Sequence, residues 1–240
     1  MLTNENYFSP ENQMKYMSVS QFKSFEKCPA SALAEVSGKY TPERSVSLLV
    51  GSYVDAHFEG TLNVFKAKNP VLFKKDGTLK SEYINANNII SRVEQDKLFM
   101  EFMSGEKQVI MTGEIEGVPV KIKMDSYHQG KMIVDLKCMK DFKPVYKPGK
   151  GRLNWVEAWE YDLQGAVYQE IVRQNTGVRL PFFLAAVTKE KEPDIEIISI
   201  GQEYLDFQLD RFKKTFSITM RSSRVWSSRS AADTVITVKQ

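Results

Sequence analysis

Cysteine and histidine are both scarce in this 240-residue chain, which contains two of each. By themselves, Cys28 and Cys138 cannot build a disulfide framework, an iron–sulfur cluster or an all-cysteine zinc site. Any metal ion that this chain binds must therefore be held mainly by oxygen or nitrogen ligands.

Long apolar runs are also missing. No uncharged apolar stretch approaches the roughly 18 residues that a bilayer crossing needs, and residues 1–8 lack the basic-then-apolar order of a signal peptide. We therefore expect a cytoplasmic protein with no membrane partner. The composition, 42% hydrophobic and 26% charged, is typical of a globular domain. We predict one domain over residues 1–240, with flexible ends at residues 1–17 and 227–240.

The net charge of +3 is too small to indicate nucleic-acid binding by itself, but positive charge is concentrated locally. Residues 137–152 contain one acid and six bases, and a second basic stretch covers residues 211–229. The six bases are Lys137, Lys140, Lys143, Lys147, Lys150 and Arg152. Such a run is more often solvated surface, and the alternative is a sequence-independent grip on a nucleic-acid backbone.

Capping signals and apolar periodicity predict several helices. Ser18 with Gln21 forms a capping box for the first, and Pro29 begins the second. Further helices are expected over residues 47–59, 81–103, 154–175 and 202–224.

From residue 108 the apolar period changes to two, which is typical of strands. Strands are predicted over residues 109–115, 118–125 and 132–137, and turn signals between them indicate one antiparallel meander. Two more strands are expected over residues 182–188 and 195–200. The whole pattern predicts an α/β domain in which a mixed central sheet, begun by the meander, is flanked by helices.

Two acids and a lysine meet at the end of this meander. Asp135 and Lys137 leave the same face of one strand, and folding the chain at the second turn brings Asp125 about opposite Asp135, with roughly 5 Å between their Cβ atoms. Two carboxylates this close repel unless a cation lies between them. Oxygen ligands without cysteine or histidine suit Mg²⁺ or Mn²⁺, and the lysine could orient a water or stabilise charge on a phosphate.

These residues could instead have a purely structural role. An acid-x-Lys triplet also occurs at Asp141-Phe142-Lys143, as expected by chance, and turn-flanking acids with a salt-bridged lysine need no function. The first triplet differs because it ends an apolar strand, where a buried ion pair is costly unless it is matched or used.

Asp125, a turn and then Asp135-Leu136-Lys137 resemble the signature of the PD-(D/E)XK nucleases. Two further motifs are similar to those of the RecB-like and RecE-like branch, which includes the lambda-type exonucleases. They are Ser18-Val19-Ser20-Gln21-Phe22 followed by Cys28-Pro29, and Gln164-Gly165-Ala166-Val167-Tyr168. The resemblance implies a restriction-endonuclease-like core.

The resemblance also implies site residues. Asp55, Asp125, Asp135 and the Leu136 carbonyl would hold one or two metal ions, while Lys137 and Gln164 position the attacking water. The family often has a GxxxH motif, whose His supplies a metal ligand from a helix. Counting from Gly51 puts Asp55 at the position of that His, and the nearby His57 is the alternative ligand. The side chains at positions 55 and 57 point about 200° apart on a helix, so both cannot face the same metal. We assign Asp55, since a third carboxylate suits Mg²⁺. No iron–sulfur cluster is expected, so Cys28 is predicted to be a small buried residue.

The DNA-contacting residues are predicted from their faces. By strand parity Lys121 and Lys123 share the side of Asp125, and Tyr161 and Tyr168 share that of Gln164, so all four could meet DNA beside the metals. The alternative is that they are ordinary solvated or rim residues. Beyond them, we expect contacts from Lys140, Lys143, Lys147, Lys150 and Arg152.

The resemblance implies a Mg²⁺-dependent or Mn²⁺-dependent exonuclease that degrades one strand of a duplex end from 5′ to 3′. It further implies a ring-shaped homo-oligomer and a single-strand annealing partner in phage recombination. A structure-specific or restriction-type endonuclease on the same core, or an inactive DNA-binding module, are the alternatives. Decay of the acid-x-Lys triplet would mark the inactive module, and both residues are present here.

Overall fold

The computed structural model of this protein describes residues 1–222, with side chains up to residue 216. The predicted flexible tail at 227–240 lies outside the described residues, and so do Arg224 and Arg229 of the second basic stretch.

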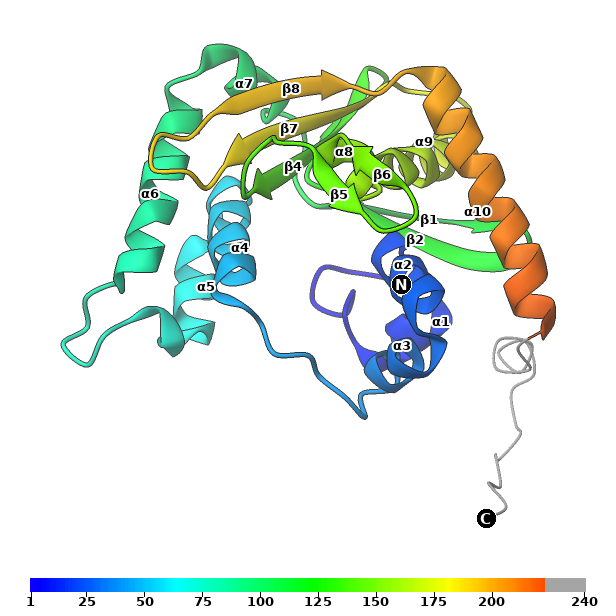
Figure 1. Cartoon of the computed structure of the whole chain (residues 1–240), viewed down its shortest axis with the longest axis horizontal. Coiled ribbons are helices and arrows are strands. Elements are labelled where there is room, and N and C mark those ends of the chain that lie inside the picture. The colour runs from blue at the N-terminus through cyan, green and yellow to red at the C-terminus, as the bar shows by residue number, and fades with distance from the viewer. Residues whose placement is uncertain (223–240) are drawn as a thin grey trace.

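The central sheet is mixed, with strand order β3-β4-β7-β8 (Figure 1). Its central pair, β4 and β7, runs parallel, and both outer pairs are antiparallel. The four strands are β3 (Ser126–His128), β4 (Met132–Met139), β7 (Phe182–Thr188) and β8 (Ile195–Ser199). The expectation of a mixed sheet flanked by helices is confirmed.

The prediction that three consecutive strands form one continuous meander is wrong. β1 (Val109–Ile115) and β2 (Val118–Met124) form a separate two-stranded hairpin, and only the short β3 continues onto β4. The ladder is interrupted because the Leu136 amide, which in an unbroken register would lie opposite Met124, donates instead to the side chain of Asp125. The side chain of Asp125 thus takes the amide hydrogen bond that an unbroken ladder would use.

The two faces of the sheet are covered by different helices (Figure 1). Val134 and Leu136 of β4 pack into a cluster with α4, α6 and α7, whereas Ile133 packs with α2, α9 and α10. Because side chains alternate along a strand, Asp135 and Lys137 lie on the α9 side. The helices are α2 (Val19–Lys27), α4 (Val46–Phe58), α6 (Ser81–Glu94), α7 (Lys97–Phe102), α9 (Tyr161–Thr176) and α10 (Gln202–Ser222).

The N-terminal leader does not extend freely from the domain. Met17 is buried and bridges to β2: its amide donates to the Pro119 carbonyl, and its carbonyl accepts from the Lys121 amide. Tyr7 is also buried, although the leader has no periodic apolar pattern. The leader contains α1 (Pro10–Lys15), and it leads into the capping box that Ser18 and Gln21 were predicted to form.

Two predicted long helices are each broken in two. Residues 81–103 divide into α6 and α7 because Asp96 caps a new start, accepting from the Phe99 amide. Residues 154–175 divide into α8 (Trp155–Ala158) and α9, because Glu160 takes the left-handed conformation with φ of 56°. The predicted cap at Asn154 is confirmed: its side chain accepts from the Glu157 amide.

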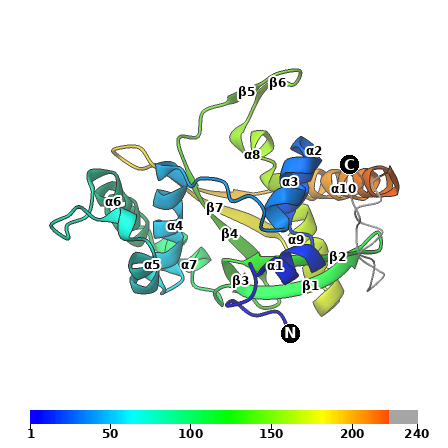
Figure 2. The ribbon, with the colours of Figure 1, turned by 90° about the horizontal axis from the view of Figure 1, so that it is seen from below.

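The basic segment forms a hairpin that was not predicted. β5 (Val145–Lys147) and β6 (Gly151–Leu153) pair antiparallel and stand away from the sheet (Figure 2). The remaining short elements are α3 (Pro29–Val36), α5 (Leu62–Lys68) and a 3-10 turn, η1 (Pro70–Leu72).

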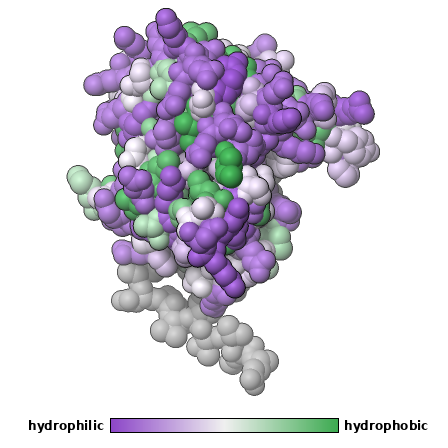
Figure 3. Space-filling model, turned by 90° about the vertical axis from the view of Figure 1, so that its left-hand side faces the viewer, coloured by the Kyte–Doolittle hydropathy of each residue, from purple (hydrophilic) through white to green (hydrophobic). Residues whose placement is uncertain are grey.

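The surface over α5 and α6 is mostly hydrophilic, with scattered hydrophobic side chains (Figure 3). No helix among residues 1–222 is both long and apolar enough to cross a membrane.

Gly165 permits the close approach of α9 to β7. A Cβ atom at this position would lie 2.5 Å from the Cδ1 atom of the buried Phe182. We expect Gly165→Ala to lower the free energy of unfolding by about 1–3 kcal/mol through overpacking, measured by urea denaturation. Gly51→Ala in α4 is the matched control, since its nearest neighbour would be 3.8 Å away, and it should cause no loss. Equal losses in both variants would contradict this account of the packing.

Candidate active site

Asp125 occupies the break between β2 and β3, and both of its carboxylate oxygens are held. Oδ2 accepts a 2.9 Å hydrogen bond from the Leu136 amide, and Oδ1 accepts a 3.2 Å hydrogen bond from Nε2 of Gln108. Since Ser126 pairs with Val134, the antiparallel register places Asp125 opposite Asp135, as the turn spacing predicted.

Asp135 is buried on β4 between two of the other predicted residues. Gln164, from α9, donates a 2.7 Å hydrogen bond from Nε2 to Oδ1 of Asp135, and the ammonium of Lys137 forms an ion pair with Oδ2. The same ammonium lies 4.8 Å from the ring centroid of Tyr161. Residues from β4 and α9 that are distant in sequence thus form one contact network.

The structure separates Asp55 from His57. Asp55, on α4, lines a small cavity with Asp125, Leu136 and Gln108. The His57 ring instead pairs with Glu94 of α6, at 2.8 Å. The geometry therefore groups Asp55, and not His57, with Asp125 and Leu136.

The carboxylates in this cluster are hard to ionise together. Burial and then repulsion from Asp135 raise the pKa of Asp125 to about 7, although Lys137 opposes the shift. Burial and the neighbouring Asp125 raise the pKa of Asp55 well above its ordinary value. Burial disfavours the Lys137 ammonium, but Asp135 outweighs it, so the pKa of Lys137 lies above its usual range and this side chain stays charged.

The chemistry of the donors fits a hard divalent cation such as Mg²⁺ or Mn²⁺. Asp55, Glu59 and Asp125 line the small cavity, and Oε1 of Gln108, which lines the same cavity, is buried without a hydrogen-bond partner. Across residues 1–222, no three Asp, Glu, His or Cys side chains already stand in an arrangement that could hold a metal ion. The donor types suit the ion, and coordination would require the carboxylates to turn from their present hydrogen bonds.

A second cavity also includes Lys137 and Gln164 in its lining. Its walls come from the leader, α2, β2, β4 and α9. Its lining residues are Tyr7, Phe8, Gln13, Ser18, Val19, Ser20, Lys23, Lys123, Lys137, Gln164 and Tyr168.

Of the residues predicted to contact DNA, Lys123 and Tyr168 are accessible from the second cavity, whereas Lys121 is not. Lys123 and Tyr168 line the second cavity, with the Tyr168 hydroxyl donating to the Lys123 carbonyl at 3.1 Å. Lys121 is fully buried, so the prediction that it meets DNA is wrong for this structure. Parity placed it on the correct strand face, but the leader covers that face: its ammonium donates to the carbonyls of Tyr7 and Asn12 and to Oε1 of Gln13.

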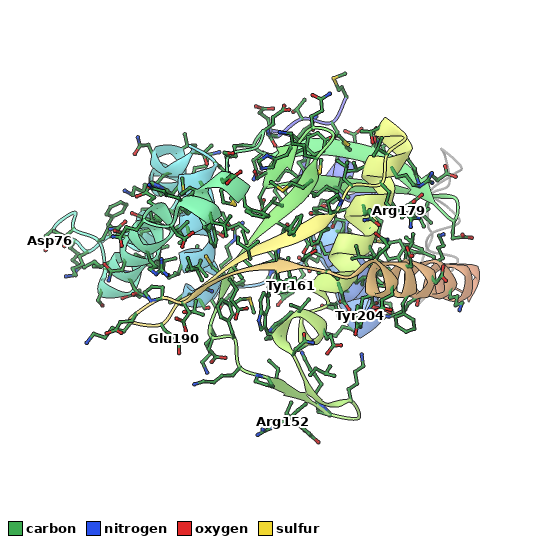
Figure 4. All side chains as sticks on the ribbon, turned by 90° about the horizontal axis from the view of Figure 1, so that it is seen from above. Asp76, Arg152, Tyr161, Arg179, Glu190 and Tyr204 are labelled. Atoms are coloured by element: carbon green, nitrogen blue, oxygen red, sulfur yellow. The ribbon has the colours of Figure 1, made fainter. Side chains whose placement is uncertain are left out.

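The other predicted bases lie in and before the β5–β6 hairpin. Lys140, Lys143, Lys150 and Arg152 are exposed, and Arg152 projects at the far end of the hairpin (Figure 4). The Lys147 ammonium lies 4.4 Å from the ring centroid of Trp159. These bases stand outside the acid cluster, on the segment that follows β4 and includes the β5–β6 hairpin.

Cys28 is exposed at the junction of α2 and α3, so the prediction of a small buried residue is wrong. It ends one helix and precedes Pro29, which begins the next, and this junction lies at the surface.

Several residues that line the two cavities were not predicted from the sequence. Glu59 lies one helical turn after Asp55 and lines the same cavity, so its spacing could have revealed it. Gln108, Tyr7, Phe8 and Lys23 carry no such signal, because only the fold brings the leader, α2 and the residue before β1 to the site.

Comparison with known proteins agrees with this geometry. A family described as "PDDEXK-like domain of unknown function (DUF3799)" matches residues 18–232. The chain belongs to the PD-(D/E)XK nuclease superfamily. A crystal structure of a protein named "Putative exonuclease" from Eubacterium rectale is 47% identical, with a TM-score of 0.91, over 95% of this chain and 88% of that one. A structure named SSO0001 has 11% identity and a TM-score of 0.32, over 86% and 88% of the two chains, and carries no weight. No curated protein matches the chain.

The raised pKa of Asp125 makes the stability of the metal-free protein depend on pH. Between the unfolded value, about 3.9, and the folded value, about 7, the native state binds more protons, so stability falls as pH rises. We expect Asp125→Asn to raise the Tm in EDTA by about 4–8 °C more at pH 7.5 than at pH 5.5. Thermal unfolding of both proteins at the two pH values measures this.

Asparagine can replace the aspartate without losing its partners. Its Oδ1 can accept from the Leu136 amide, and its Nδ2 can donate to Oε1 of Gln108 after that amide flips. A Tm difference that is the same at both pH values would contradict the electrostatic account.

Proposed function

We propose that this protein is a metal-dependent DNA nuclease that hydrolyses phosphodiester bonds. The observation that carries the proposal is the contact network of Asp135, Lys137 and Gln164, next to Asp125, which lines one small cavity with Asp55 of α4. Membership of the PD-(D/E)XK superfamily supports it, since the sequence resemblance assigns Asp125, Asp135 and Lys137 to the signature of that superfamily.

Asp55, Asp125, Asp135 and the Leu136 carbonyl would hold one or two Mg²⁺ or Mn²⁺ ions. Such an ion, when bound, lowers the pKa of a water molecule and stabilises charge on the phosphate. The residues of the chain supply the rest. Asp135 keeps Lys137 charged, and Gln164 fixes the orientation of Asp135. The Lys137 ammonium is then placed to donate to the attacking water or to a phosphate oxygen during in-line displacement.

The preference for DNA ends rests on the relative from Eubacterium rectale, whose name describes an exonuclease. We extend this activity to the present chain as an end-dependent exonuclease. A 5′-to-3′ direction, a ring-shaped homo-oligomer, a single-strand annealing partner and a role in phage recombination follow only from the resemblance to RecE-like enzymes.

The exposed bases after Lys137 suit the DNA backbone. Lys140, Lys143, Lys150 and Arg152 stand on the segment that leaves β4 directly after the site. Contacts of this kind neutralise phosphates without reading sequence, and they weaken as salt rises. The hairpin would therefore hold duplex DNA beside the acids.

Digestion of linear and covalently closed circular duplexes tests the proposed activity. With Mg²⁺ we expect loss of end-labelled linear DNA only, and no loss with EDTA. Asp135→Asn should reduce the rate at least about 100-fold, because it removes a metal ligand and the partner of Lys137. The label released first reports the direction of degradation.

The remaining outcomes separate the alternatives. Cutting of closed circles would indicate an endonuclease on the same fold. Salt-sensitive DNA binding without any cutting would indicate an inactive binding module. Asp141→Asn, in the second acid-x-Lys triplet, is the matched control and should cut at the wild-type rate.

Metal binding distinguishes the two helix residues. We expect Asp55→Ala to weaken Mn²⁺ binding at least about tenfold in calorimetric titration, because it removes an oxygen donor from the cluster. His57→Ala should leave the affinity unchanged, since its ring pairs with Glu94. Loss of binding in His57→Ala together with normal binding in Asp55→Ala would reverse the assignment.

A further inference from the structure

The second cavity joins the leader to the reaction site. It has a volume of about 260 Å³, and its walls include Lys137 and Gln164 as well as Tyr7, Phe8 and Lys23. The family match begins at Ser18, so the aromatic pair from the leader lies before the matched range. A segment without any apolar pattern in its sequence thus forms one wall of a cavity whose opposite wall carries the proposed chemistry.

A buried lysine fixes the leader in this position. The Lys121 ammonium donates to the Tyr7 carbonyl at 2.6 Å and to Oε1 of Gln13 at 3.0 Å, and it lies 4.4 Å from the Tyr7 ring centroid. The bridge between Met17 and Val120 secures the other end of the leader. These contacts hold the backbone of Tyr7 against β2. They therefore determine where the side chain of Phe8 lies.

Phe8 is the exposed member of the aromatic pair. Its side chain is 66% exposed, whereas Tyr7 is buried, and the two rings meet edge to face at 4.9 Å. The ammonium of Lys123 lies 5.2 Å from the Phe8 ring centroid, so a cation adjoins the ring. Lys23 contributes a second cation to the same cavity, and it donates to the Trp159 carbonyl at 2.9 Å.

An exposed aromatic ring with one cation beside it and a second in the same cavity is suited to binding a nucleotide. Nucleobases stack on aromatic side chains regardless of sequence, since every base has a π-face, while lysines contact the adjoining phosphates. The cavity is slightly smaller than the roughly 300 Å³ at which small-molecule sites begin, which suits one base better than a base pair.

We propose that this cavity receives a single unpaired nucleotide at the end of the DNA substrate, with its base stacked on Phe8 and its phosphates beside Lys23 and Lys123. The inference rests on the proposed nuclease function. It adds that the leader is a substrate-binding element and that the enzyme prefers ends carrying an unpaired base.

A double-mutant cycle tests the stacking contact without cleavage. Fluorescence anisotropy in EDTA would compare two duplexes that carry one unpaired terminal nucleotide, with either a base or an abasic sugar at that position. We expect the wild-type protein to bind the duplex with the base about tenfold more tightly. Phe8→Ala should remove this preference, and Phe8→Trp should keep it.

Phe207→Ala is the matched control. Phe207 is 67% exposed on α10 and lines a different cavity, so the preference for the base should survive its removal. Because Phe8 is exposed, its removal should leave the Tm unchanged, which thermal unfolding checks.

A wild-type protein without the preference, or a preference that persists in Phe8→Ala, would overturn the stacking proposal even if Mg²⁺-dependent digestion proceeds normally. A change of oligomeric state in Phe8→Ala, with the preference retained, would show that Phe8 contacts protein, and it would overturn the proposal too. Absence of DNA binding by the wild-type protein in any salt would overturn both this inference and the proposed function.

Discussion

Repulsion among buried carboxylates is the constraint around which this fold is arranged. Asp55, Asp125 and Asp135 approach one another from a helix, a strand break and a strand, and burial raises the pKa of the first two. The Lys137 ammonium offsets part of that repulsion. A divalent cation bound at this cluster would offset the remainder, because its two positive charges would lie where the negative charge is most concentrated. The same ion would then stabilise the fold and serve the proposed chemistry.

The main elements of the domain serve this arrangement. The interruption between β2 and β3 frees the Leu136 amide to hold Asp125, and the close packing at Gly165 brings α9, with Gln164, onto β7 beside β4. The α4 helix on the opposite face supplies Asp55. The leader, secured by Lys121, closes the side that faces Lys137. Each of these elements contributes a group that could not form the site by itself.

Much of this could be predicted where the information is local. The capping box at Ser18, the turn at Glu116-Gly117 and, to within one residue, the bounds of β1 and β2 depend on neighbouring residues, and they agree with the structure. The opposition of Asp125 and Asp135 followed from counting across one turn. The break at Glu160 did not, because a left-handed glutamate is stabilised by tertiary contacts that no periodicity reports: its carboxylate pairs with Arg211 of α10.

The burial of Lys121 was beyond prediction for the same reason. Strand parity gives the direction of its side chain but not which segment covers it, and here the covering segment is the leader, more than a hundred residues earlier in the chain. Cys28 shows the converse error, because a residue type that is usually buried stands at an exposed helix junction.

Anomalous diffraction from crystals grown with Mn²⁺ tests the central claim most directly. The account predicts a manganese peak within about 2.5 Å of carboxylate oxygens from Asp125 and Asp135 and of the Leu136 carbonyl, with Asp55 turned toward it. A peak at His57 and Glu94, or a cluster that stays free of metal while manganese binds elsewhere, would contradict it.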